Sequence, residues 1–164
     1  MQKLIFFLLR SFSGILAVFL FMTLTASAGG RFSDNGDGTV TDHKTGLMWS
    51  KSDNQGNISW HQAVKWVKYT FADTITSPYN DWRMPTLEEL ESLYSQDTAY
   101  EGYETDCGQK VKIVPEVELS CGWLWTSEKK NITARLYNFQ KGYHYTDRMV
   151  KTRGYRVLPV RSLK

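Results

Sequence analysis

The chain is short of the residues that build metal sites and disulfide scaffolds. Its 164 residues include two cysteines, three histidines and four prolines. Two cysteines allow one disulfide at most, which excludes a disulfide-rich mini-protein. The histidines, His43, His61 and His144, share no metal-ligand spacing with one another or with a cysteine. The remaining composition, with 23% charged and 41% hydrophobic residues, is that of an ordinary globular domain.

Signatures of nucleotide binding and of common catalysis are also missing. The sequence holds no Walker loop, GxGxxG, HExxH or GxSxG motif. It contains no repeat or low-complexity tract, and its length suits one domain. We therefore expect a non-catalytic protein with no nucleic-acid partner and, apart from the calcium considered below, no cofactor.

The sequence has no apolar run long enough to cross a membrane as a helix. The clean run over Ile15–Leu24 has 10 residues, and a spanning helix needs about 20. Positive charge precedes this run at Lys3 and Arg10. Ala26-Ser27-Ala28 follows it in the small-x-small pattern that signal peptidase accepts.

These features together predict an exported protein, periplasmic or secreted. The signal peptide is expected over residues 1–28, with cleavage between Ala28 and Gly29, which leaves residues 29–164 as a single domain with no transmembrane span. The alternative is an uncleaved anchor that reaches back through Leu4–Leu9.

Charges of opposite sign gather in opposite parts of the chain. Residues 29–127 hold 8 Lys/Arg and 15 Asp/Glu, whereas residues 128–164 hold 10 Lys/Arg and 2 Asp/Glu. Such a split can steer a polyanion to the basic face. Alternatively, the two parts neutralise each other within one compact fold.

The two cysteines are expected to form a disulfide. An exported chain with an even cysteine count usually pairs them, so we predict a bond between Cys107 and Cys121. In the chain-entropy model, closing a loop of about 15 residues contributes about 3 kcal/mol. The loop is polar and contains Gly108 and Pro115, so we expect it to be mobile without the bond. A metal site at the cysteines is the weaker alternative.

Capping boxes mark the starts of two helices. Ser59 with Gln62 predicts a helix that ends near residues 69–70, and Thr86 with Glu89 predicts a second helix. Each start is followed by apolar residues at helical spacing. In the first helix these are Trp60, Ala63, Val64 and Val67, and in the second they are Leu87, Leu90, Leu93 and Tyr94.

Short strands surround the two helices. Asn-Gly and Asp-Gly steps within residues 34–38 predict a hairpin turn, and residues 47–49 predict a further strand. After a long loop over residues 95–120 we expect an antiparallel sheet. Its predicted strands cover residues 123–127, 132–139, 143–150 and 155–161. The expected fold class is therefore α+β, with small antiparallel sheets, two flanking helices and a disulfide-tied loop.

Two groups of side chains are candidate binding sites. Calcium could bind at Asp34, Asp37 and Asp42, although Asx turns explain the same residues without a metal. A basic and aromatic surface could bind a sulfated or acidic glycan, because Lys and Arg pair with anionic groups. A solvated sheet face explains this second group equally. Its members are Lys129, Lys130, Arg135, Tyr137, Lys141 and Tyr143.

Six tryptophans are present, which is many for a domain of this size. Trp49 and Trp60 fall at apolar positions, and we expect most of the six to be core residues. Trp66 and one of Trp123 and Trp125 are expected to be more exposed.

Several long motifs resemble the Lcl C-terminal domain family, long catalogued as a domain of unknown function. They are Arg31–Asp42, Thr45–Trp49, Asp81–Leu90, Trp125–Ser127 and Tyr155–Arg161. The resemblance implies a bacterial, usually exported domain whose fold is similar to that of C-type lectins. The namesake domain ends a collagen-like adhesin and is associated with binding of sulfated polysaccharides. No collagen-like Gly-x-y tract occurs in this chain.

The resemblance favours an exported, adhesin-like binding module for a surface glycan or another polyanion. Two alternatives remain open. One is an enzyme related to the formylglycine-generating enzymes, which have a related fold and use cysteines as active metal ligands. The other is a structural subunit of an envelope assembly. Fold analogy alone does not decide among them.

Overall fold

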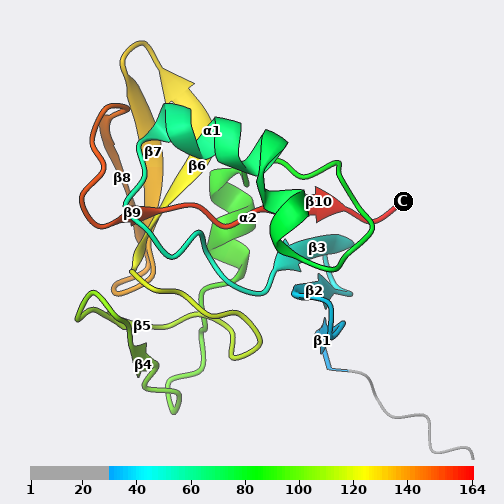
Figure 1. Cartoon of the computed structure of the whole chain (residues 1–164). Helices are drawn as coiled ribbons and strands as arrows, with labels where there is room; N and C mark the ends of the chain where they lie inside the picture. Colours follow the sequence, from blue (N-terminus) through cyan, green and yellow to red (C-terminus); the bar gives the residue numbers. More distant parts are fainter. Residues whose placement is uncertain (1–29) are drawn as a thin grey trace, which may run out of the picture.

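The computed structural model describes residues 30–164. The predicted signal peptide and the Ala28–Gly29 cleavage site lie outside the described residues. Within them, the predicted α+β class is confirmed: two four-stranded sheets and a small hairpin combine with two helices (Figure 1).

The first sheet joins the two ends of the described chain. Its strand order is β1-β2-β3-β10, and all its pairings are antiparallel. The predicted Asn-Gly and Asp-Gly turn connects the first two strands, as expected. The strands are β1 (Phe32–Asp34), β2 (Thr39–Asp42), β3 (Leu47–Ser50) and β10 (Val160–Ser162).

The second sheet has the strand order β8-β7-β6-β9. We expected it to be wholly antiparallel, which is wrong at one edge, because β9 pairs with β6 in parallel. The single strand predicted over residues 155–161 is also divided, with β9 and β10 in different sheets. Pro159 lies between them and has no N–H to donate to a ladder. The strands are β6 (Trp123–Lys130), β7 (Thr133–Asn138), β8 (Tyr143–Arg148) and β9 (Tyr155–Arg156).

Both helices begin at the predicted capping boxes. Helix α1 (Trp60–Tyr69) starts after Ser59, and α2 (Leu87–Ser92) starts after Thr86. A short 3-10 turn, η1 (Phe71–Thr74), follows α1. Among residues 30–164, no helix has the length and apolar character needed to cross a bilayer.

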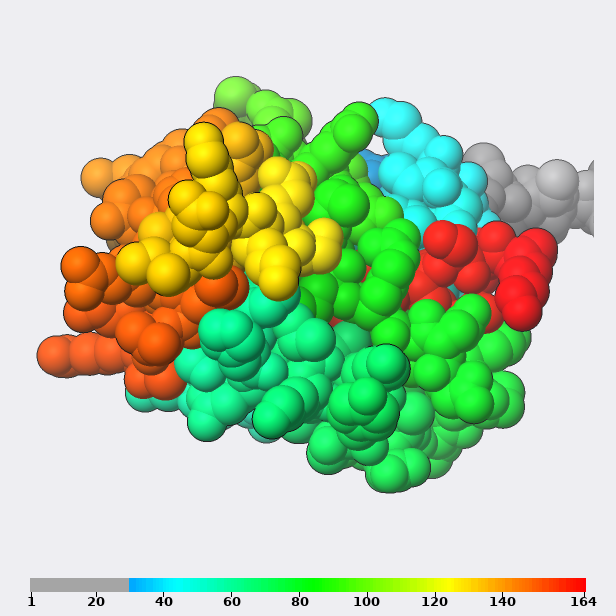
Figure 2. All heavy atoms as spheres, turned by 90° about the horizontal axis from the view of Figure 1, so that it is seen from above, coloured from blue at the N-terminus to red at the C-terminus, as the bar shows by residue number. Residues whose placement is uncertain are grey.

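The helices cover opposite faces of the second sheet. Apolar residues of α1 pack in one core with Trp125 and Leu136, whereas those of α2 pack in the other core with Leu124 and Tyr137. These pairs alternate along β6 and β7, as expected for neighbouring residues of a strand. Figure 2 looks down on the molecule from above, onto the yellow end of the β6–β7 hairpin, with α1 beside it in teal.

The long loop differs from its prediction. It contains the hairpin β4 (Tyr103–Glu104) and β5 (Lys110–Val111), and the predicted Cys107–Cys121 disulfide is confirmed, with its Cα atoms 5.4 Å apart. The description of the loop as polar is wrong, because it adds buried apolar side chains to the first core, and its mobility without the disulfide stays a prediction. They are Val111, Ile113, Val114, Val117 and Leu119.

Candidate functional site

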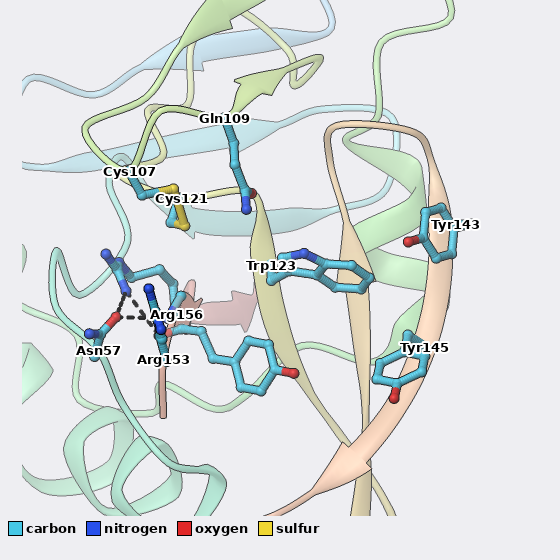
Figure 3. Close-up of a pocket in the computed structure, with 11 residues that line it drawn as sticks. Asn57, Cys107, Gln109, Cys121, Trp123, Tyr143, Tyr145, Arg153 and Arg156 are labelled. Atoms are coloured by element: carbon cyan, nitrogen blue, oxygen red, sulfur yellow. Dashed lines mark hydrogen bonds between the residues drawn. A yellow bond between two sulfur atoms is a disulfide. The ribbon is translucent and has the colours of Figure 1, made fainter. Parts of the chain in front are cut away.

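An open pocket lies at the end of the second sheet where β6 begins. Its volume is about 660 Å³, which is within the range of small-ligand sites. Figure 3 shows aromatic rings on one side of the pocket and arginines on the other. The lining residues are Asn57, Cys107, Gln109, Cys121, Trp123, Tyr143, Tyr145, Arg153, Gly154, Tyr155 and Arg156.

Strand register builds the aromatic side of this pocket. Tyr143 lies opposite Asn138, Asn138 opposite Trp123, and Trp123 opposite Tyr155, so one row crosses all four strands. Tyr145, two residues along β8, points to the same face as Tyr143. The core under α1 ends near this row, where Trp123 and Tyr155 are only half-buried.

The rings on this side remain open to solvent. The Trp123 ring centroid lies 5.4 Å from that of Tyr143 and 5.9 Å from that of Tyr145, both with edge-on geometry. The tyrosines are 46% and 49% exposed. Edge-on contacts hold the rings in place, and much of the tyrosine surface stays free for a ligand.

Two arginines form the other side of the pocket. Arg153 is exposed, whereas Arg156 is buried and held by neighbours. The Arg156 Nε–H donates to Ser120 Oγ at 2.8 Å, and its Nη1–H donates to Asn57 Oδ1 at 2.8 Å. These bonds fix the direction of the guanidinium group before any ligand arrives.

A buried carboxylate supports this arrangement from behind. Asp53 accepts hydrogen bonds from the Ser120 amide and hydroxyl, both at 2.8 Å. Burial raises the pKa of Asp53 above its usual value, although these bonds and the charge of Arg156 act against the rise. Asp53 therefore orients Ser120, which in turn accepts from Arg156.

The backbone between the arginines turns at a glycine. Gly154 has a φ of 77°, in the left-handed region that favours glycine. Its N–H donates to Asn57 Oδ1 at 2.9 Å, so one amide side chain holds both this turn and Arg156. The turn brings Arg153 and Arg156 to the same pocket.

The disulfide closes the remaining edge of the pocket. Gln109, which follows Cys107 closely, accepts a hydrogen bond from the Gly122 N–H at 3.1 Å. Both cysteines are joined to each other, and the described residues contain no free cysteine. The disulfide thus positions the loop against β6, and neither of its sulfur atoms is a free thiolate that could bind a metal.

The pocket offers positive charge and flat apolar surface together. Its lining includes two arginines but no Asp or Glu within the described part of the chain. Guanidinium groups pair strongly with carboxylate, sulfate or phosphate. The aromatic rings on the opposite side can stack against an apolar face of the same ligand.

The predicted basic and aromatic surface does not come together as one site. Tyr143 lines the pocket, but Tyr137 is only 3% exposed and packs against Tyr94 and Phe139, so its prediction as a surface residue is wrong. Lys141 lies between β7 and β8 and lines neither this pocket nor the hollow described next.

Three other predicted residues lie around a separate hollow. Lys129, Lys130 and Arg135 line a space of about 360 Å³ near the β6–β7 turn. There Arg135 pairs with Glu128 at 3.1 Å. The Trp123 pocket is at the opposite end of β6, so the sequence prediction divides between two ends of one hairpin.

The predicted calcium ligands have separate local partners. Asp34 pairs with Lys51, Asp37 accepts from the Thr39 amide, and Asp42 accepts from Arg31 and the Lys44 amide. Among residues 30–164, no cluster of three or more His, Cys, Asp or Glu side chains is placed to hold a metal. The Asx-turn interpretation describes the bonds that these residues make.

Sequence reasoning missed most of the pocket. The sequence predicts that Trp66 and one of Trp123 and Trp125 are more exposed, and the structure confirms this, because Trp66 and Trp123 are half-buried whereas Trp125 is buried. The alternation of Tyr143 and Tyr145 was the available signal for a shared face. The other missed residues are Asn57, Gln109, Arg153, Tyr155 and Arg156.

The fold and the pocket define a small α+β domain with one open aromatic and basic site. Residues 38–161 match the family model described as the Lcl C-terminal domain. The match covers most of the chain, so the protein belongs to the Lcl C-terminal domain family, as the sequence motifs predicted. A comparison with curated proteins gave no match.

Proposed function

We propose that this protein is an exported, non-catalytic module that binds acidic saccharides in the Trp123 pocket. One observation carries the proposal: exposed aromatic rings and two arginines line the same hollow, with no carboxylate among them. A saccharide with a carboxylate or sulfate group has both of the complementary surfaces, a charged substituent and an apolar ring face.

The fixed geometry of the pocket supports this choice. Arg156 is oriented by Ser120 and Asn57, so an anionic group would meet a preorganised donor. Tyr143 and Tyr145 brace Trp123 and leave much of their own surface free. A sugar ring between these two sides could stack and form charge-assisted hydrogen bonds at once.

The proposal extends to the fold and the cellular location. A C-type-lectin-like fold is supported by the addition of β10 to β3 at the edge of the first sheet, by the flanking helices and by the disulfide-tied loop. Export is supported by the sequence pattern over residues 1–28 and by the use of both cysteines in a disulfide.

Titration calorimetry on residues 29–164 tests the proposed function. The probes are a heparin tetrasaccharide, a polygalacturonate tetrasaccharide and neutral maltotetraose. We expect an acidic probe to bind more tightly than the neutral one, with affinity falling as salt rises. Arg153→Gln should weaken binding about tenfold, and Tyr145→Ala about fivefold.

Matched variants outside the pocket control for unrelated effects. Tyr69→Ala removes another exposed tyrosine, and Lys44→Gln removes another exposed cation. Both should bind the acidic probe as the unchanged protein does. Equal affinity for the neutral probe would contradict the role of the arginines, and binding that survives both pocket substitutions would place the site elsewhere.

A further inference from the structure

A second surface feature lies at the far end of the β6–β7 hairpin. The turn after Lys130 and the turn after Arg148 lie side by side, because the Met149 N–H donates to the Ile132 carbonyl at 3.0 Å. Each turn exposes one aliphatic side chain. Ile132 is 67% exposed and Val150 is 73% exposed. We call these two residues the apolar tip.

The apolar tip adds nothing to either core of the domain. Met149, next to Val150, is buried in the core under α1, whereas Ile132 and Val150 belong to neither core. Turns at hairpin ends usually carry polar residues. Two exposed aliphatic side chains on adjacent turns therefore suit contact with an apolar environment outside the protein.

Four cations surround the apolar tip. Lys129, Lys130, Arg148 and Lys151 are all exposed, and none takes part in an ion pair within residues 30–164. We call these four residues the cation rim. Each of the four lies within three residues of Ile132 or Val150 in the sequence.

Nearby acidic groups are occupied by other partners. Glu128 accepts from the Leu87 amide at 3.0 Å and pairs with Arg135. Asp147 accepts from the Tyr155 hydroxyl at 2.6 Å. Glu128 is thus paired with a cation, whereas Asp147 keeps its charge. The four cations of the rim outnumber this one carboxylate, so this end of the molecule remains net positive.

We propose that the apolar tip and the cation rim dock the protein on a bilayer rich in anionic lipid. Aliphatic side chains enter the interface between headgroups and acyl chains, while surrounding Lys and Arg side chains attract lipid phosphates. A soluble polyanion would use the cations but would gain nothing from Ile132 and Val150. The combination of the two features favours the lipid surface.

Docking in this orientation keeps the Trp123 pocket accessible. Strand β6 runs from Trp123 at the pocket to Lys130 at the cation rim. Eight residues of strand extend about 25 Å. The pocket would therefore face away from the lipid, free to meet a ligand. The lipid docking does not depend on what the pocket binds.

Vesicle cosedimentation of residues 29–164 tests the proposal. The vesicles contain either phosphatidylglycerol mixed with phosphatidylcholine or phosphatidylcholine alone, and heparin on beads serves as a soluble-type polyanion. Of the two kinds of vesicle, we expect the protein to bind only the anionic one. Lys130→Gln with Lys151→Gln should weaken it about 25-fold, or about fivefold for each cation. Ile132→Ser with Val150→Ser should weaken it about tenfold.

A charge-matched variant separates local from overall effects. Lys44→Gln with Lys141→Gln removes two exposed lysines away from the apolar tip and should leave vesicle binding unchanged within twofold. Circular dichroism confirms that each variant is folded. Three results would each overturn the proposal. The first is no binding to anionic vesicles, and the second is an equal loss of vesicle binding in the charge-matched variant. The third is that the serine substitutions leave vesicle binding intact while the Lys130 and Lys151 substitutions reduce binding to heparin.

Discussion

At the scale of single residues, an ion pair ties Arg31, just before β1, to Asp42 at the end of β2. Asp42 has a fully buried side chain and binds Arg31 through two contacts, at 3.0 and 2.7 Å. Burial by itself would raise the pKa of Asp42. The bonds from Arg31, Thr45 and Lys44 outweigh burial, so the pKa lies below its usual value of 3.8.

Replacing this carboxylate should destabilise the protein in a pH-dependent way. Asp42→Asn keeps a side-chain acceptor for the turn but removes the ion pair, and we expect a loss of about 2 kcal/mol at pH 7. A lowered pKa in the folded state stabilises the fold above pH 3.8, and this contribution disappears as pH falls through the folded value. Urea unfolding at pH 7, 5, 3 and 2 measures the difference.

The exposed Asp73 provides a comparison for this prediction. Asp73→Asn should change stability by less than about 0.5 kcal/mol at pH 7. A penalty for Asp42→Asn that stays constant down to pH 2 would show that the ion pair does not stabilise the fold through the charge of Asp42.

At the scale of elements, the sequence predicts structure well where the signal is local. It does not predict pairings between segments that are distant in the chain. Both capping boxes fixed helix starts, because Ser59 and Thr86 bind backbone groups only three residues away. The parallel pairing of β9 with β6 joins residues about thirty positions apart and has no local signature. The buried side chains of the long loop were missed for the same reason.

Glycines in the β4–β5 region give a sharp test of packing. Gly102 and Gly108 have similar positive φ angles, 81° and 75°. A Cβ at Gly102 would lie 2.0 Å from the Val111 carbonyl oxygen, whereas a Cβ at Gly108 would meet nothing within 4 Å. Gly108→Ala should cost about 1–2 kcal/mol from backbone strain alone.

Gly102→Ala adds a steric clash to the same strain and should cost at least about 2 kcal/mol more than Gly108→Ala. Chemical denaturation of both variants under the same conditions measures the difference. Equal costs would mean that the backbone at Gly102 moves away from Val111 without penalty.

At the scale of the whole molecule, the disulfide joins the long loop to the pocket. Cys107→Ser with Cys121→Ser should still fold, because the loop buries Val111, Ile113 and Val117. We expect a loss of about 3 kcal/mol in unfolding free energy. Guanidinium unfolding of the variant and of the oxidised protein measures the loss. An unchanged midpoint would show that the apolar contacts alone fix the loop.

The pocket itself was beyond sequence prediction because it is assembled from distant segments. Asn57 precedes α1, Trp123 opens β6, and Arg156 lies in β9. Composition indicated only that the basic part of the chain follows residue 127. Strand register then decided that Tyr143 shares the pocket with the arginines, whereas Tyr137 points into the core.

Saccharide binding at the pocket can be observed directly by NMR. The six indole N–H signals of ¹⁵N-labelled protein report on each tryptophan during titration with the tighter-binding acidic tetrasaccharide. We expect the Trp123 signal to shift and saturate, while the signals of buried Trp49 and Trp82 stay in place. Arg153→Gln should raise the dissociation constant obtained from this titration about tenfold. An unmoved Trp123 signal at ligand saturation would contradict saccharide recognition by this pocket.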